Sequence, residues 1–172
     1  MVILDEGVKE KWSQVENVYQ RRSDLIPNLV ATVKGYAKHE ENTFTQLAEA
    51  RSKAGGTFNI SEEVLNDPAL FEKFQEAQSS LGGALQRLMM ITENYPELKA
   101  NESFLSLQSE LEGTENRITV ERMRFNEAAK GYNTYIRTFP NNLMANMFGF
   151  SQRPYFKAVS GAEVAPTVDF GE

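Results

Sequence analysis

Apolar side chains recur at steps of three or four residues along three long segments of the chain. The first series runs from Val8 to Leu47, the second from Val64 to Tyr95 and the third from Phe104 to Phe139. This spacing places each series on one face of an α-helix. No segment sustains the alternation of a strand. The pattern therefore predicts an all-α fold, an elongated antiparallel bundle of three long helices with a short C-terminal helix.

Glycine, serine and proline mark the limits of the first two helices. The first helix is expected over about residues 5–53, ended by the glycines at 55–56. Ser61, followed by two glutamates, predicts the start of the second helix, and Pro96 predicts its end near residue 94. The glycine pair at 82–83 falls inside this helix. It indicates either a close approach of a neighbouring backbone or a local bend.

The third helix and the C-terminal part have boundaries of the same kind. Asn101 is a suitable N-cap for the third helix, and Pro140 should end it. A short helix follows within residues 141–150. We therefore expect a bundle domain over residues 1–150 and an extended tail over residues 151–172 that packs on the bundle.

Pro27 lies inside the first predicted helix. It has no N–H to donate to the carbonyl of Ser23 and clashes with that turn, at a cost of about 3 kcal/mol. Two interpretations follow: a kink within one helix, or two helices with Asp24 capping the second. The apolar series passes through Ile26 and Leu29 without losing phase. We therefore favour one helix kinked at Pro27.

Composition excludes several kinds of chemistry. The chain has 172 residues, enough for one domain, and a net charge of −6, which argues against a nucleic-acid partner. It contains no cysteine, so disulfides, thiolate zinc sites and cysteine nucleophiles are excluded. No apolar run approaches the ~20 residues that span a bilayer.

Long helical bundles often hold a pair of metal ions bridged by carboxylates. That site needs Glu-x-x-His on two helices. The only histidine is His39, and position 36 is Tyr36. We therefore predict no catalytic residue, no metal site and no cofactor.

The polar residues Arg22, Glu40, Thr114 and Glu121 lie within otherwise apolar series. They are either buried acids and bases of a reactive site or structural partners that set helix register. We favour the structural interpretation. Our hypothesis is that Arg22 pairs with a carboxylate of the third helix, first Glu121 and second Glu115.

Several short motifs are more specific than periodicity. They include Arg-Arg-Ser-Asp-Leu-Ile-Pro-Asn-Leu at 21–29, Ala-Glu-Ala-Arg at 48–51 and Tyr-Pro-Glu-Leu at 95–98. Over almost its whole length the chain resembles the bacterial LemA family. The signature residues that carry this resemblance are Arg21, Arg22, Asp24, Pro27, Asn28, Tyr95, Pro96, Asn101, Asn116, Arg117, Asn126, Tyr132, Asn133 and Pro140.

The resemblance implies a membrane location. Members of the family carry one transmembrane helix directly before a domain of this kind, with the bulk of the protein on the cytoplasmic side. We expect that helix upstream of Met1 in the natural protein. The resemblance transfers no catalytic residue.

Two classes of function remain open. The first is a non-enzymatic interaction or scaffold domain with an unidentified protein partner at the bacterial membrane. The alternative is a metal- or small-ligand-binding protein, or an enzyme, that uses the polar residues on the helix faces. Direct binding of lipid by the domain is disfavoured by the net charge of −6.

Overall fold

A computed structural model describes residues 1–56 and 61–157, and all regular structure in this part of the chain is helical. The all-α prediction is therefore confirmed. The helices are α1 (Val2–Lys34), α2 (Glu41–Gly56), α3 (Ser61–Val64), α4 (Pro68–Thr92), α5 (Pro96–Lys99), α6 (Glu102–Arg137) and α7 (Asn141–Phe148).

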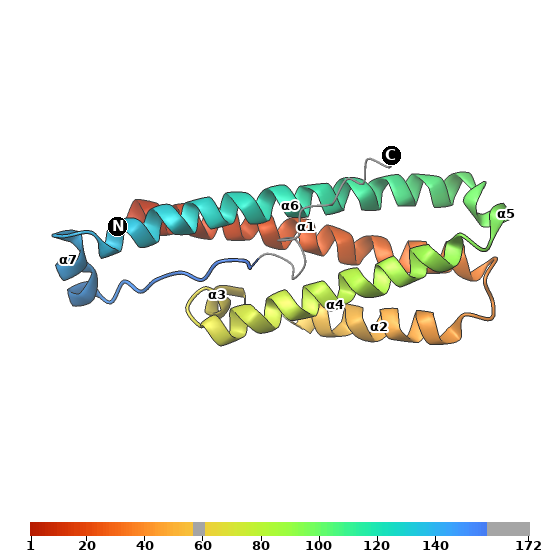
Figure 1. Cartoon of the computed structure of the whole chain (residues 1–172), viewed down its shortest axis with the longest axis horizontal. Coiled ribbons are helices and arrows are strands. Elements are labelled where there is room, and N and C mark those ends of the chain that lie inside the picture. Colours follow the sequence, from red (N-terminus) through yellow and green to blue (C-terminus); the bar gives the residue numbers. More distant parts are fainter. Residues whose placement is uncertain (57–60, 158–172) are drawn as a thin grey trace, which may run out of the picture.

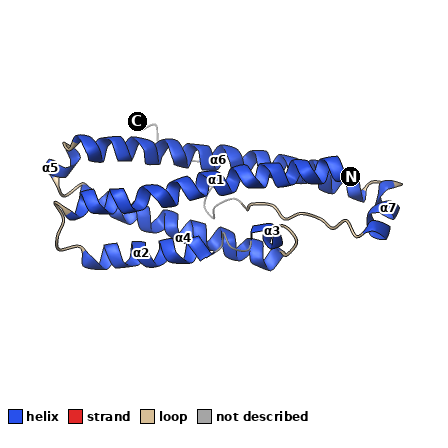
Figure 2. Ribbon diagram, turned by 180° about the vertical axis from the view of Figure 1, so that it is seen from behind, coloured by secondary structure: helices blue, strands red, loops and turns tan. Residues whose placement is uncertain are grey.

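The long helices run up and down along one axis and form an elongated antiparallel bundle (Figures 1 and 2). Helix α1 packs mainly on α6, and α2 mainly on α4. With 36 residues, α6 is about 54 Å long. The short helix α5 and the α1–α2 turn lie at one end of the bundle, and the N-terminus and α7 lie at the other (Figure 1).

The prediction of one helix over residues 5–53 is wrong. Helix α1 ends at Lys34, and the chain turns back through residues 35–40 before α2 begins, so the bundle has four long helices. Periodicity missed the break because Val33, Ala37 and Phe44, on both sides of it, are buried in the same core. A tight turn kept the three-and-four spacing while reversing the chain direction.

The expected start of the second helix at Ser61 also needs correction. Only the single turn α3 begins there, and the long helix α4 starts at Pro68. The side chain of Asp67 accepts a hydrogen bond from the backbone N–H of Ala69 at 2.9 Å. Proline suits the first helical position, where no N–H is required, so Asp67 and Pro68 together form the stronger start signal.

The other boundaries follow the sequence closely. The Asn101 side chain accepts from the backbone N–H of Phe104 at 3.0 Å and caps α6. Gly149, with a φ of 74°, ends α7 in the left-handed conformation. Helix α1 runs unbroken through Pro27, so the alternative of two helices divided at Asp24 is wrong.

Two apolar clusters make up the core. The first contains the aromatic side chains of Trp12, Phe71, Phe125 and Phe156 and lies in the half of the bundle near the N-terminus. The second contains residues of α1, α2, α4 and α6, including Leu47. Both clusters are lined by α1, α4 and α6, whereas α2 contributes only to the second.

An extended segment takes the place of α2 beside the first cluster. Residues 151–157, called the strap below, follow α7 and run back along the bundle (Figure 1). Arg153 and Phe156 of the strap are buried. The predicted tail packs on the bundle over this part, and residues 158–172 lie outside the described residues.

Candidate functional site

A layer of polar side chains crosses the bundle between the two apolar clusters. Arg22 on α1, Gln78 on α4 and Thr114 on α6 are all buried. On each of these helices, residues of the first cluster lie on one side of the layer and residues of the second cluster on the other. The polar residues on three helices therefore lie at one level.

Arg22 is the centre of this layer and is only 3% exposed. Its Nη2 donates to the backbone oxygen of Gln78 at 2.7 Å and to Oε1 of the same residue at 3.0 Å. Its Nη1 donates to Oε1 of Glu115 at 3.2 Å. A Cβ at Gly82 would lie 3.3 Å from Nη1, so the glycine leaves room for the guanidinium.

The structure corrects the first choice of partner for Arg22. Glu121 binds Arg124 at 3.1 Å, within its own helix. Glu121 is six residues beyond Glu115, about 9 Å further along α6, and so lies at the level of the aromatic cluster. The carboxylate of α6 that meets Arg22 is Glu115, the second choice.

Pro27 is compensated by a side chain from another helix. The carbonyl oxygen of Ser23, which has no proline N–H to bind, accepts a hydrogen bond from Nε of Arg51 at 3.1 Å. Ser23 is buried, where a carbonyl without a donor would destabilise the fold. Two motifs of the sequence, at 21–29 and 48–51, therefore meet across α1 and α2.

A cavity of about 710 Å³ opens beside this contact, between α1 and α2. We call it the Pro27 groove. The lining is Ile26, Pro27, Val30, Lys34, Lys38, Glu41, Phe44, Thr45, Ala48 and Arg51. Three cations and one carboxylate give a local charge of +3 − 1 = +2, in a chain whose net charge is −6. An apolar floor with a basic rim suits an amphipathic segment that carries acidic side chains.

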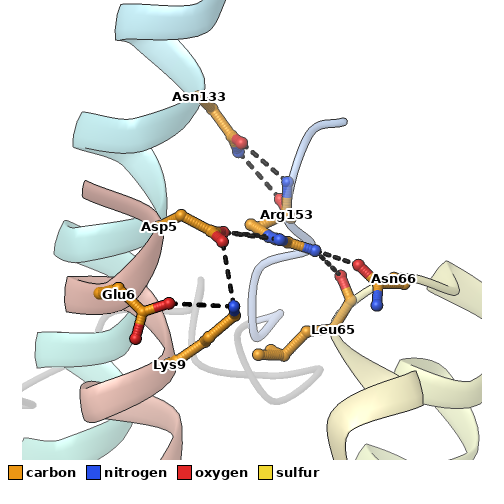
Figure 3. A network of polar contacts seen from close by, with 7 residues as sticks. All are labelled: Asp5, Glu6, Lys9, Leu65, Asn66, Asn133 and Arg153. Carbon is orange, nitrogen blue, oxygen red and sulfur yellow. Dashed lines mark hydrogen bonds and ion pairs between the residues drawn. The ribbon is translucent and has the colours of Figure 1, made fainter. Parts of the chain in front are cut away.

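A second polar network holds the strap near the N-terminus (Figure 3). Arg153 is buried, and its Nη2 and Nε donate to Oδ1 of Asp5 at 2.6 Å and 3.2 Å. Its Nη1 donates to the backbone oxygen of Leu65 at 3.4 Å and to Oδ1 of Asn66. Arg153 thus joins α1, the α3–α4 connection and the strap.

Electrostatics favour the ionised form of Asp5. Burial acts to raise the pKa of its carboxyl group, but the hydrogen bond and charge of Arg153 and the nearby Lys9 outweigh burial. The pKa of Asp5 is therefore below its usual value. The ion pair between Asp5 and Arg153 is a structural one, which links the two ends of the described chain.

Two asparagines of α6 bind the strap through its backbone. Asn133 donates to the carbonyl of Arg153 and accepts from its N–H, both at 2.8 Å. Asn126 does the same for Phe156, at 3.1 Å and 2.8 Å. Seven residues of helix and three extended residues both cover about 10 Å, so the two amides match the two backbone positions.

The other signature residues fall into two groups. Tyr95 donates to Glu40 at 3.3 Å and Asn101 donates to Tyr36 at 3.1 Å, which joins the starts of α5 and α6 to the α1–α2 turn. Most residues of the second group are exposed on the surface. The exposed members are Arg21, Asp24, Asn28, Asn116, Arg117 and Pro140. Of the other two, Pro96 is the first residue of α5 and Tyr132 is buried in the first cluster.

Sequence reasoning missed several of these contacts. Gln78, Asp5 and Arg153 make buried polar contacts. Gln78 lies in the second apolar series between Phe74 and Leu81, which was a usable signal of burial, but its contact with Arg22 was not predicted. Arg51 belongs to the motif at 48–51, which was a usable signal. Within the described residues, no group of three or more histidine, aspartate or glutamate side chains is placed so that it could hold a metal ion.

Comparison with known proteins identifies the family. The model of the LemA family matches residues 11–170. The chain belongs to the LemA family. Among curated relatives, Magnetosome protein MamQ 2 of Paramagnetospirillum magneticum is 29% identical over 171 residues, which is 91% of this chain and 63% of the relative.

Other relatives agree with the family assignment. Magnetosome protein MamQ of Magnetospirillum gryphiswaldense is 29% identical and covers 90% of this chain and 62% of its own length. Protein LemA of Metamycoplasma hominis is 25% identical over 85% of this chain and 62% of its own. The chain thus spans less than two thirds of the length of these curated relatives. No helix among the described residues has the length and apolar character to cross a bilayer.

Proposed function

We propose that this LemA-family chain is a non-enzymatic interaction domain held at a bacterial membrane. The observation that carries the proposal is the Pro27 groove, which is open to solvent, apolar at its floor and basic at its rim. A partner that presents an acidic, amphipathic segment fits this surface. Its position between α1 and α2 places it over the most specific motif of the sequence.

The buried charged groups support a structural use of polar residues over a catalytic one. Arg22 is bound by Gln78 and Glu115, and Arg153 by Asp5. Each of these contacts joins different elements of the fold. Glu40, which sequence reasoning left open as a reactive acid, accepts a hydrogen bond from Tyr95. Stoichiometric metal in the purified protein, lost in Glu40→Ala, would overturn this part of the proposal.

The membrane location includes the topology of the longer protein. We expect a single transmembrane helix upstream of α1 and the bundle on the cytoplasmic side. A form extended upstream to the natural start should resist extraction by alkaline carbonate, and the bundle should be protected from protease added outside spheroplasts. Release by carbonate would contradict the anchor, and digestion in intact spheroplasts would contradict the cytoplasmic side.

Site-specific crosslinking tests the groove directly. A photoreactive amino acid at Thr45, which lines the groove, should give a discrete crosslinked product in native membranes. The same probe at Thr119, exposed on α6, is the matched control. Lys34→Glu with Lys38→Glu should abolish the Thr45 product, because the rim then repels an acidic segment.

The possible outcomes distinguish a specific contact at the groove from nonspecific crosslinking. Equal products at Thr45 and Thr119 would show nonspecific contact. A product at Thr45 that survives the two charge reversals would contradict an acidic partner. No product at either position would remove the groove as the interaction surface.

A further inference from the structure

We propose that the end of the bundle formed by α7 and the start of α1 binds directly to the lipid surface of the membrane. We call this surface the apolar tip and define it by Val2, Ile3, Phe139, Leu143, Met147 and Phe148, all exposed. The inference rests on the proposed membrane location and adds a second, reversible contact with the bilayer.

Exposed apolar side chains are concentrated at this end. Eight of the fifteen large hydrophobic residues exposed in the described chain belong to residues 2–4 or 139–148. Helix α7 buries only Ala145. Met1 and Ala145 pack on the same apolar cluster, and the N-terminus and α7 share one end of the bundle in both views (Figures 1 and 2). Exposed apolar side chains that gather at one end of a molecule in this way indicate an interaction site.

The absence of charge in the tip's sequence favours lipid over a protein partner. Residues 138–152 form a run of fifteen without any charged side chain or histidine. A protein-binding patch usually has a polar rim that gives specificity. A segment with exposed Phe, Leu and Met and no charged side chain over residues 138–152 instead suits partial burial at the boundary between headgroups and acyl chains.

The net charge of −6 does not oppose this contact locally. Among residues 1–9, the acids are Asp5 and Glu6, and both are paired, Asp5 with Arg153 and Lys9, and Glu6 with Lys9. Arg137 adds an exposed cation on the last turn of α6. These groups sum to +3 − 2 = +1, so the expectation that repulsion prevents lipid binding does not apply to this end.

The chain offers a matched pair of positions for a spectroscopic test. Met147 is 67% exposed on α7, and Met90 is 72% exposed in the last turn of α4. Because the chain has no cysteine, Met147→Cys or Met90→Cys gives one site for an environment-sensitive fluorophore. With phosphatidylcholine vesicles, the label at 147 should shift to shorter wavelength and the label at 90 should not. Burial of apolar surface drives this contact, so added salt should change it little.

Substitution of the tip should weaken vesicle binding. Leu143→Ser with Phe148→Ser removes two exposed apolar side chains, and we expect binding to fall on the order of tenfold or more. Leu105→Ser with Met90→Ser, exposed elsewhere, should leave it unchanged. Circular dichroism of both variants checks that the fold is retained.

Several results would overturn the inference. These are no spectral shift at 147, or an equal shift at both positions. A shift that grows with protein concentration without vesicles would assign the tip to a second copy. A shift with native membranes but not with pure lipid would assign it to a membrane protein. None of these results affects carbonate extraction of the anchored form or crosslinking at Thr45, so a failure of the inference is distinct from a failure of the proposed function.

Discussion

Buried charged side chains in this protein are stabilised by specific hydrogen bonds and ion pairs, and Arg22 is the clearest case. Its guanidinium is bound by two oxygens of Gln78 and one of Glu115, but the two partners differ in environment. Gln78 is buried, whereas the Glu115 side chain is 44% exposed. A buried charge depends most on partners that water cannot replace. The contribution of Arg22 is therefore larger than that of the ion pair alone.

Substitutions in the Arg22 layer should have unequal effects. Arg22→Ala removes the charge but leaves Gln78 without its donor, and we expect unfolding free energy to fall by about 3 kcal/mol. Glu115→Gln should cost under about 1 kcal/mol, because the amide oxygen can still accept from Arg22 and water screens the charge of this partly exposed partner. Urea unfolding measures both.

A double-mutant cycle identifies the partner of Arg22. Coupling with Glu115 should be positive and about 0.5–1 kcal/mol. Coupling with Glu121 should be zero within error, since its carboxylate binds Arg124. Coupling with Glu121 and none with Glu115 would make Glu121 the partner of Arg22 and would contradict the structure.

Asp5 should make stability depend on pH. Its pKa is lowered in the folded state, so its stabilisation is complete above the unfolded value of 3.8 and is lost as pH falls through the folded value. At pH 7, Asp5→Asn should cost roughly 3 kcal/mol because it leaves Arg153 buried without its charge partner. The difference from the parent protein should shrink below about pH 4.

Glu6→Gln is the control for this pH effect. Glu6 is exposed and bonded only to Lys9 among the contacts found in the described residues. It should change stability little at any pH. A cost for Asp5→Asn that stays constant down to pH 2 would mean that the pair with Arg153 does not form.

Elements of this fold are joined by side chains that satisfy backbone groups of other elements. Arg51 of α2 binds the Ser23 carbonyl that Pro27 leaves without a donor. Asn126 and Asn133 supply the strap with a donor and an acceptor at each of two residues. These side chains complete the hydrogen bonding of backbone that regular structure cannot. Their substitution should therefore weaken the attachment of a whole helix or of the strap to the bundle.

The pairing of Pro27 with Arg51 gives an element-scale prediction. Arg51→Ala should lower unfolding free energy by about 1–2 kcal/mol, because the buried Ser23 carbonyl loses its donor. In a Pro27→Ala background the restored N–H supplies that donor, so the same change should cost about 1 kcal/mol less. Lys53→Ala, exposed on α2, is the control and should have no effect in either background. Equal costs of Arg51→Ala in both backgrounds would contradict the compensation.

The whole molecule has a core divided by a polar layer but held together by continuous helices. Helices α1, α4 and α6 contribute side chains to both apolar clusters. Unfolding of one half would fray the helices that support the other. We therefore expect the described bundle to unfold as one cooperative unit.

The single tryptophan allows a test of this cooperativity. Trp12 reports on the first cluster, while far-ultraviolet circular dichroism reports on all helices. The two transitions in urea should coincide. Leu88→Ala, in the second cluster, should shift both by the same amount, about 2–5 kcal/mol. A Trp12 transition that stays in place while the dichroism becomes biphasic would show two independent halves.

Local chemistry along the chain determined the helical class of this protein, its buried helix faces and several helix ends. The spacing of apolar residues set the helical class and the faces that are buried, because a helix presents every third or fourth residue to one side. Asn101 and Gly149 act as expected because a cap depends on a few adjacent residues. The clash at Pro27 and its consequence for Ser23 were also readable, since both follow from the missing N–H.

Only the tertiary structure decided how these elements meet. The turn at residues 35–40 kept the periodicity of a single helix, so reversal of the chain left no trace in the spacing. The choice of Glu115 over Glu121 depended on the axial offset between α1 and α6, which packing of the core sets. Arg153 meets Asp5 across 148 residues, and the apolar tip exists because the N-terminus and α7 come to the same end. Such contacts depend on three-dimensional position, which a one-dimensional spacing does not contain.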